Sequence, residues 1–255
     1  MSTPKFEPRE RLDGEVAVII GGTGAIGLAT ARRMAERGAR IALIQRRPVE
    51  QAEAALRALP GSGHLALSAS VTDSASLNEA ARTVRERLGP ASLLVNSAGF
   101  TVAVPAADLD GLSDALIDEI FAANWRGTFA AIRAFAPQLR ERGDAAIVNV
   151  SSIAAFTGLG SNLAYAAAKA GIDALTKALA KTLAPDIRVL AVSPGVVDTG
   201  FVPGRDADFN DKVAPTLPLR RVGTADDVAA AVVAACTLLR YATGSIFVVD
   251  GGRHL

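Results

Sequence analysis

The chain has 255 residues, half of them hydrophobic, and its 27 basic side chains nearly balance its 26 acidic ones. This length allows one large α/β domain, and the balanced charge gives no indication of nucleic acid or an acidic membrane surface as a partner. Because Cys236 is the only cysteine, an intramolecular disulfide and a cysteine-based metal cluster are excluded, and we expect no bound metal and a cytoplasmic protein.

Short apolar runs alternate with amphipathic, alanine-rich segments along the whole chain. The apolar runs predict strands at 16–20, 41–44, 65–67, 92–95, 146–150, 187–192 and 246–249. Helical patterns lie at 25–37, 49–58, 74–88, 113–140, 162–183 and 225–239. This alternation predicts an α/β fold, a doubly wound Rossmann-type parallel sheet of about seven strands with helices on both faces.

The chain shows no composition shift that would mark a domain boundary, so we expect one domain over residues 1–255 with an N-terminal arm at 1–13. The arm lacks the apolar core of a signal peptide, and no apolar run reaches membrane-spanning length. Residues 193–221 hold four of the twelve prolines and a charged patch at 205–208. This irregular segment follows a strand directly, which predicts a lid over a substrate site.

The first predicted strand runs into a glycine-rich turn at 21–27, and the first predicted helix follows it. Gly22, Gly24 and Gly27 form a G-x-G-x-x-G pattern. Glycines let backbone amides approach a pyrophosphate, and a helix N-terminus adds a favourable dipole. The turn therefore predicts dinucleotide binding; the alternative is a plain turn between strand and helix.

The end of the second predicted strand discriminates between the two nicotinamide dinucleotides. An enzyme that uses NAD often places an acid there to accept from the ribose hydroxyls. This chain has Gln45, Arg46 and Arg47, and its next carboxylate is Glu50. Because a guanidinium suits a 2′-phosphate, Arg46 and secondarily Arg47 favour NADP(H), with NAD(H) still possible. The alternative is that both arginines are solvated loop residues.

Tyr165 and Lys169 lie four residues apart on one predicted helix and therefore share a face. A free tyrosine has a pKa of about 10, and a nearby ammonium lowers that pKa. The pair predicts a phenol that exchanges protons near neutral pH. The alternative is that Tyr165 packs in the core and Lys169 is solvated.

Two further polar positions support that prediction. Ser151 and Ser152 follow the fifth predicted strand, where ligand sites of α/β sheets gather. The Ser152 hydroxyl is a candidate to hold the substrate oxygen; the alternative is a serine that caps a helix. Asn124 lies inside a long helical pattern although asparagine is a poor helix former, which predicts a side chain or water bound to a freed backbone carbonyl; the alternative is an ordinary exposed asparagine.

Over nearly its whole length the chain resembles the short-chain dehydrogenase/reductase family. The matching pieces, in the family's order and spacing, are GGTGAIG (21–27), NSAG (96–99), Asn124, Ser152, YAAAK (165–169), SPGVVDT (193–199) and VDGG (249–252). The resemblance implies that Tyr165 is the general acid and base, that Ser152 orients the substrate carbonyl, and that Lys169 tunes Tyr165 and holds the nicotinamide ribose. It also implies that Asn124 anchors a water in a proton relay through Lys169.

The resemblance extends to the cofactor site. It implies that Asn96 supports the central sheet and the cofactor region, and that Val197 and Thr199 hold the carboxamide. Two departures are Ala25, where the family's pattern has glycine, and Ser70, where many relatives have an aspartate that contacts adenine. The residues that we expect at the cofactor are Gly21, Thr23, Gly24, Ala25, Ile26, Gly27, Arg46, Arg47, Ser70, Val71, Asn96, Ala98, Gly99, Tyr165, Lys169, Pro194, Gly195, Val197 and Thr199.

The substrate pocket is expected between the loops that follow the fourth to sixth strands. Its candidate lining residues are Phe100, Thr101, Val102, Ile153, Phe156, Leu159, Asn162 and Val196, with Phe201 and Val202 from the lid. Most of these are apolar, and Arg205 on the lid is the one arginine expected near the mouth. This favours a neutral, partly hydrophobic ketone or alcohol. For the C-terminal residues 253–255 we expect a free tail or a contact between subunits.

The leading interpretation is an oxidoreductase that transfers a hydride between NADP(H) and a small carbonyl or alcohol compound, in the manner of 3-oxoacyl-thioester reductases. The resemblance also implies a homo-oligomer, a dimer or a tetramer, that packs through the helices at 113–140 and 162–183. The alternatives are an NADP(H)-binding regulatory protein, and an isomerase or dehydratase on the same fold. Four polar residues in the family's catalytic positions argue against a purely regulatory role.

Overall fold

Seven runs of residues form one parallel sheet with the strand order β3-β2-β1-β4-β5-β6-β7. The computed structural model describes residues 9–204, 206 and 208–255. Each predicted strand is present, and most extend one or two residues beyond the apolar run. The strands are β1 (Val16–Ile20), β2 (Arg40–Gln45), β3 (Leu65–Ser68), β4 (Leu93–Asn96), β5 (Ala145–Val150), β6 (Ile187–Pro194) and β7 (Ile246–Val249).

The helices alternate with the strands, as the sequence predicts. They are α1 (Ala25–Ala35), α2 (Val49–Arg57), α3 (Ser74–Leu88), α4 (Asp114–Phe121), α5 (Gly127–Arg142), α6 (Ala154–Thr157), α7 (Leu163–Leu183), α8 (Phe209–Val213) and α9 (Ala225–Thr237). Among the described residues, no helix combines the length and the apolar character that a membrane crossing requires.

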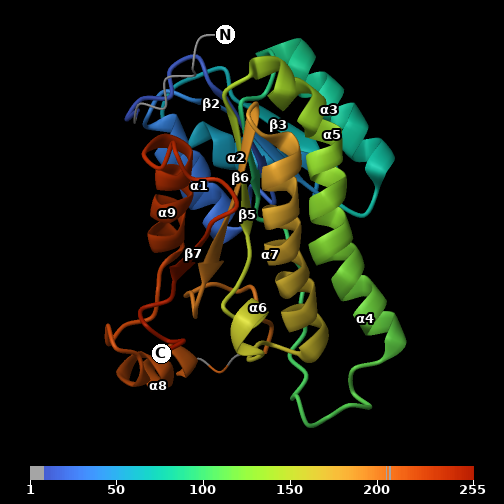
Figure 1. Cartoon of the computed structure of the whole chain (residues 1–255), viewed down its shortest axis with the longest axis vertical. Helices are drawn as coiled ribbons and strands as arrows, with labels where there is room; N and C mark the ends of the chain where they lie inside the picture. The colour runs from blue at the N-terminus through green and yellow to red at the C-terminus, as the bar shows by residue number, and fades with distance from the viewer. Residues whose placement is uncertain (1–8, 205, 207) are drawn as a thin grey trace.

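Helices cover both faces of the sheet, because alternate strand residues point to opposite sides and both sets are apolar. On one face Val18, Leu94 and Ile147 pack with α3, α5 and α7. On the other face Ile19 and Val148 pack with α1, α2 and α9. Figure 1 shows the resulting three layers, with α6, α8 and the C-terminus gathered at one end of the molecule. The doubly wound fold predicted from the sequence is confirmed.

The helix predicted at 113–140 is interrupted in its middle. A π-helical segment, η1 (Ala122–Arg126), separates α4 from α5, and the Gly127 amide donates to the carbonyl of Ala122. The Thr128 hydroxyl donates to the carbonyl of Asn124 at 2.7 Å. A side chain therefore satisfies this carbonyl, as the asparagine in the helical pattern predicts. Segments of this kind are rare and are frequent at functional sites.

The predicted N-terminal arm and lid are described only in part. Residues 1–8, Arg205 and Ala207 lie outside the described residues. The rest of the arm is packed, since Leu12 is buried and Arg9 donates to Glu15 at 2.6 Å. The segment predicted as a lid begins inside β6 and is less irregular than expected. It contains α8, a 3-10 turn η2 (Ala214–Thr216) and a bridge from Val197 to Gly223.

Buried amides join the centre of the sheet to α7. Asn96 on β4 and Asn149 on β5 are register partners, and Asn96 Nδ2 donates to Asn149 Oδ1 at 2.9 Å. Asn149 Nδ2 in turn donates to Thr176 Oγ1 on α7 at 3.0 Å. The predicted role of Asn96 in the central sheet agrees with this position. The chain of amides fixes α7, and with it Tyr165 and Lys169, against the carboxyl half of β5.

Replacing Asn149 tests whether this chain of amides stabilises the fold. Asn149→Ala leaves the buried Asn96 amide and the Thr176 hydroxyl without their partners. We expect the free energy of unfolding in urea to fall by roughly 2–4 kcal/mol. Asn78→Ala, at an exposed position of α3, is the matched control and should change it by less than about 0.5 kcal/mol. Equal stabilities of the two variants would contradict the assignment.

Candidate active site

The glycine-rich turn lies where β1, β4 and α1 meet, and two of its glycines permit close packing. Gly21 has a φ of +78°, and a Cβ there would lie 2.6 Å from the Ala98 amide nitrogen. A Cβ on Gly27 would overlap the carbonyl oxygen of Gly21. Gly24 precedes α1, and no described side chain caps this helix. The first amides of α1 are thus left available for an anionic ligand.

The end of β2 separates a buried amide from two exposed guanidinium groups. Gln45 is buried, accepts from the Thr23 hydroxyl and donates to the carbonyl of Pro48 at 2.9 Å. Arg46 and Arg47 are exposed, and the structure gives neither an ion pair nor a hydrogen bond to another described residue. Gln45 therefore builds the turn, while the two arginines are available for a charged ligand.

Tyr165 and Lys169 share one face of α7, as their spacing predicts. The side chain of Asn162 caps α7 by accepting from the Tyr165 amide at 2.7 Å. Lys169 Nζ lies 5.6 Å from the centre of the Tyr165 ring and donates to the carbonyl of Val150 at 2.7 Å. Burial lowers the pKa of Lys169 to about 8, although Asp173 one turn further along opposes this shift. The alternative of a solvated lysine is therefore wrong.

Ser151 and Ser152 follow β5 and have different surroundings. The Ser151 hydroxyl is buried and donates to the carbonyl of Lys169 at 3.4 Å. The Ser152 hydroxyl accepts from the amide of Ala154 at 3.2 Å, at the start of α6. Ser152 therefore caps a turn and lines the central cavity at the same time. The two interpretations of Ser152, as a capping serine and as a candidate to hold the substrate oxygen, are therefore compatible.

Asn124 is fully buried beside the loop that follows β4. Its Nδ2 donates to the carbonyls of Ile120 and Phe100, at 2.9 and 2.7 Å. Its Oδ1 is buried and has no partner among the described residues. This oxygen lies 2.9 Å from where a Cβ on Gly99 would be, so glycine is needed there. A buried acceptor without a partner is costly, which makes it a candidate for a bound water or ligand donor.

One cavity of about 780 Å³ brings most of the predicted site together. It runs from the glycine-rich turn past the ends of β4, β5 and β6 to the face of α7 that carries Tyr165 and Lys169. The predicted site residues that line it are Gly24, Ala25, Ile26, Gly27, Ala98, Gly99, Ser152, Tyr165, Lys169, Pro194, Gly195, Val197 and Thr199.

Other predicted site residues do not line this cavity. They are Gly21, Thr23, Arg46, Arg47, Ser70, Val71, Asn96 and Asn124. Among these, the Ser70 hydroxyl bonds to that of Thr72 at 2.8 Å, and Val71 packs against Gly127 at the start of α5. Each of them still lies at or after the end of a strand, at the carboxyl edge of the sheet, or contacts a segment that does. An extended dinucleotide spans such an edge from the centre of the sheet outward.

The predicted substrate residues divide into two groups. Those that line the cavity are Ile153, Leu159, Asn162, Val196, Phe201 and Val202, whereas Phe100, Thr101, Val102 and Phe156 do not. Thr101 is buried, and its hydroxyl bonds to the side chains of Ser161 and Asn162. Phe156 is half exposed and meets the His254 ring edge-on at 5.6 Å. For these four, the prediction of pocket lining is wrong, and the contacts of Thr101 and Phe156 engage those two side chains elsewhere.

Sequence reasoning missed some residues at the cavity. Ser97, whose hydroxyl donates to the carbonyl of Ile20 at 3.0 Å, lines it beside the glycine-rich turn. Val150 offers the carbonyl that holds Lys169. Arg253 lines it too, so the C-terminal residues do not form a free tail, and Arg205, the arginine expected at the mouth, lies outside the described residues. The sequence feature that could have predicted Arg253 at the cavity is its position just after the last strand, β7.

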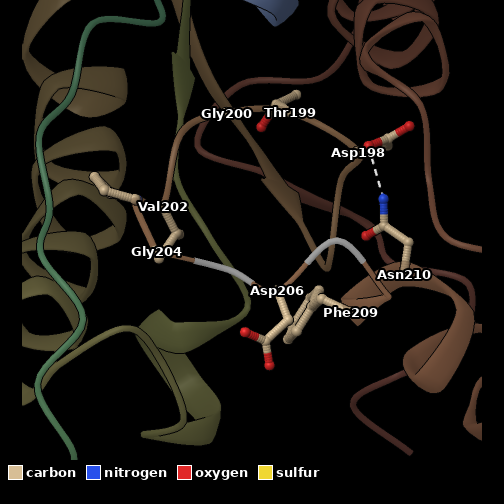
Figure 2. A pocket seen from close by; sticks show the side chains of 9 residues that line it. Asp198, Thr199, Gly200, Val202, Gly204, Asp206, Phe209 and Asn210 are labelled. Carbon is tan, nitrogen blue, oxygen red and sulfur yellow. Dashed lines mark hydrogen bonds between the residues drawn. The ribbon is translucent and has the colours of Figure 1, made fainter.

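A second cavity, of about 350 Å³, lies on the other side of the loop that follows β6. Thr199, Gly200, Val202 and Phe209 line both cavities, so this loop forms a wall between them. Figure 2 shows the smaller cavity and the hydrogen bond at 2.7 Å from Asn210 Nδ2 to Asp198 Oδ1. This bond ties α8 to the loop.

Comparison with known proteins gives consistent matches over nearly the whole chain. The family model described as enoyl-(acyl carrier protein) reductase matches residues 21–254. A Streptomyces violaceoruber protein, provisionally named as a ketoacyl reductase of the granaticin polyketide synthase, is 38% identical over 247 residues, covering 95% of this chain and 97% of that protein. The D-threitol dehydrogenase of Mycolicibacterium smegmatis is 36% identical and covers 95% of this chain and 94% of its own.

A solved structure agrees with these relatives. The NADPH-bound short chain oxidoreductase of Pseudomonas aeruginosa PAO1, described as having an atypical catalytic center, superposes with a TM-score of 0.86 at 33% identity. The match covers 95% of this chain and 97% of that one.

The buried amine of Lys169 makes protein stability depend on pH in a defined direction. The pKa of Lys169 is about 8 in the folded chain, whereas an ordinary lysine, as in the unfolded chain, has a pKa of 10.5. Between these two pH values the unfolded chain therefore holds a proton that the folded chain lacks. Raising the pH then removes protons from the unfolded chain and stabilises the fold. We expect the free energy of unfolding of wild type, relative to Lys169→Met, to rise with pH across this window. Parallel profiles for the two proteins would contradict the burial of this amine.

Proposed function

The chain belongs to the short-chain dehydrogenase/reductase family, and we propose that it is an NADP(H)-dependent oxidoreductase that interconverts a ketone and an alcohol. The family binds nicotinamide cofactors and acts on alcohol and ketone groups. The observation that carries the proposal is the single cavity shared by the glycine-rich turn, Tyr165 and Lys169. The relatives' names give different substrates, so none of them is transferred to this chain.

The residues present fit a nicotinamide dinucleotide. Gly21 and Gly27 let the glycine-rich turn pack closely, and the uncapped start of α1 faces the cavity through Gly24 and Ala25, where its amides would meet a pyrophosphate. Arg46, with Arg47 beside it, would hold the 2′-phosphate, because both are exposed at the end of β2 and Gln45 replaces the usual acid. Bound NADPH supplies a hydride to the carbonyl carbon, and NADP⁺ accepts it in the reverse direction.

The Tyr165 hydroxyl would donate a proton to the carbonyl oxygen during reduction and accept it back during oxidation. Lys169 favours the phenolate form, because its ammonium lies close to the ring and its amine is held by Val150. Ser152 at the start of α6 would donate to the same substrate oxygen. General acid–base catalysis of this kind contributes about 10²- to 10⁴-fold to the rate.

Asn124 would complete the supply of protons. Its Oδ1, which has no partner among the described residues, would accept from a water that connects to Lys169. The residues of the segment at 193–221 that line the cavity would act as a lid, and Asp198 with Asn210 would anchor α8 to it. We further propose that the chain is one domain, located in the cytoplasm, and that it assembles as a dimer or tetramer through α4, α5 and α7.

A regulatory NADP(H)-binding protein and an isomerase or dehydratase remain as alternatives. Net consumption of NADPH with a ketone separates the proposed reductase from both of them. A regulatory protein would bind the cofactor without turnover, and an isomerase would leave its redox state unchanged.

Tyr165→Phe tests the proton donor directly. Phenylalanine keeps the ring that contacts Phe201 at 6.0 Å, so the fold and NADPH binding should persist. We expect kcat for ketone reduction to fall by about 10²- to 10⁴-fold, while NADPH fluorescence titration gives a Kd close to wild type. Retained turnover in this variant would exclude Tyr165 as the acid.

Arg46→Ala tests the choice between the two cofactors. Loss of the guanidinium should raise KM for NADPH by about 10- to 100-fold and leave KM for NADH nearly unchanged. Arg57→Ala on the neighbouring α2 removes the same charge from an exposed position and serves as the control. Equal changes with NADPH and NADH in Arg46→Ala would refute the contact with the 2′-phosphate.

A further inference from the structure

We propose that Arg253 binds a carboxylate of the substrate, so that the preferred substrate is an oxo acid or the matching hydroxy acid. The inference rests on the proposed function and goes beyond it, because it names the charge of the substrate. The sequence alone favours a neutral substrate, since no arginine is expected at the pocket apart from Arg205. The structure places Arg253 in the lining of the central cavity.

The charge of the cavity points to an anionic ligand. Two cationic residues, Lys169 and Arg253, are found among the described residues that line it, together with no aspartate and no glutamate. Lys169 already donates to the carbonyl of Val150 and supports Tyr165. The guanidinium of Arg253 has no ion pair or hydrogen bond to any described side chain. Among the described lining residues, Arg253 is therefore the one cation to which no other role is assigned.

Asp250, three residues before Arg253, is engaged within its own turn and forms no ion pair with Arg253. Asp250 Oδ1 accepts from the amide of Gly252 at 2.9 Å. Asp250 Oδ2 accepts from the amide of His254 at 2.9 Å and contacts the His254 ring Nδ1 at 2.7 Å. The carboxylate thus closes the turn that contains Arg253. Arg253 is exposed and lines the cavity, so its side chain is accessible to a ligand that enters there.

The same contacts hold residue 253 at the substrate end of the cavity. The His254 ring packs edge-on against Phe156 of α6 at 5.6 Å, and Gly252 approaches Pro218. Asp250 lies against Gly195, one of the residues expected at the cofactor, in the loop that follows β6. Phe156 belongs to α6 and Pro218 to the segment proposed as a lid, whereas Gly21 of the glycine-rich turn packs against Ala98, just after β4. Arg253 is therefore positioned to meet the substrate rather than the pyrophosphate.

A carboxylate fits this site better than a phosphate does. The planar guanidinium pairs with either group through two parallel hydrogen bonds. A phosphate monoester carries about −1.5 to −2 charges near neutral pH, which one arginine does not balance, whereas a carboxylate carries one. The remaining substrate lining is mostly apolar, with Ile153, Leu159 and Val196 among its members. An apolar pocket with one charged contact orients a ligand by that contact.

The test compares oxo acids with their methyl esters. A panel of linear and cyclic oxo acids of increasing length, each paired with its ester, is reduced by wild type, Arg253→Ala and Arg253→Lys. We expect wild type to prefer its best acid over the matching ester by about 10- to 100-fold in kcat/KM. Arg253→Ala should bring this ratio close to one, and Arg253→Lys should retain part of it. Arg87→Ala, at an exposed position of α3, is the control for net charge and should keep the full ratio.

A binding measurement separates this inference from the proposed function. The saturated analogue of the best acid, which has no ketone, is titrated calorimetrically into protein loaded with NADP⁺. We expect Arg253→Ala to weaken its binding by about 10- to 100-fold.

If wild type reduced no ketone but bound the analogue through Arg253, the proposed function would fail and the anion site would be retained. If wild type reduced acids and esters equally and both proteins bound the analogue equally, the carboxylate site would be refuted and the reductase would stand. An effect of Arg253→Ala on the Kd for NADPH that matched its effect on the acid would also overturn the assignment.

Discussion

In a parallel sheet the carboxyl ends of all strands meet at one edge, and this constraint organises the whole site. The turn at Gly21 follows β1, Arg46 follows β2, Ala98 follows β4 and Ser151 follows β5. These residues are far apart in sequence, yet the sheet holds them along one line. The buried amides of Asn96 and Asn149 then fix α7 against the same strands. A chemical site arises there because backbone direction, rather than sequence proximity, decides which side chains meet.

Burial of Lys169 connects this architecture to the proposed proton transfer. The lysine gives up solvation to lie beneath the Tyr165 ring, and burial lowers its pKa to about 8. The carbonyl of Val150, at the end of β5, compensates in part by accepting from the amine. An amine near its titration point can pass a proton as well as stabilise a phenolate. The strand end thus sets the position of the amine next to the tyrosine, and its burial lowers the pKa of that amine.

The sequence predicts most of the fold because buried parallel strands appear as uninterrupted apolar runs, and α1 and α7 have clear periodicity. Motif spacing also identifies Tyr165 and Lys169, since one helical turn alone brings them together. Other features depend on tertiary contacts. The asparagine in the helical pattern indicates a disturbed helix, but its hydrogen bond to the carbonyl of Phe100 comes from the loop after β4. The place of Arg253 just after β7 does not by itself show that it lines the cavity. The carbonyl of Val150 is also invisible to sequence reasoning, because any residue supplies one.

We propose that one cavity receives both the nicotinamide and the substrate oxygen beside Tyr165. A crystal structure of the protein with NADPH would show whether it does. We expect a pyrophosphate on the amides of Gly24 to Gly27 and a nicotinamide ring within reach of the Tyr165 hydroxyl and Lys169. A dinucleotide bound elsewhere, or a nicotinamide ring separated from Tyr165 by intervening side chains, would rule out this arrangement.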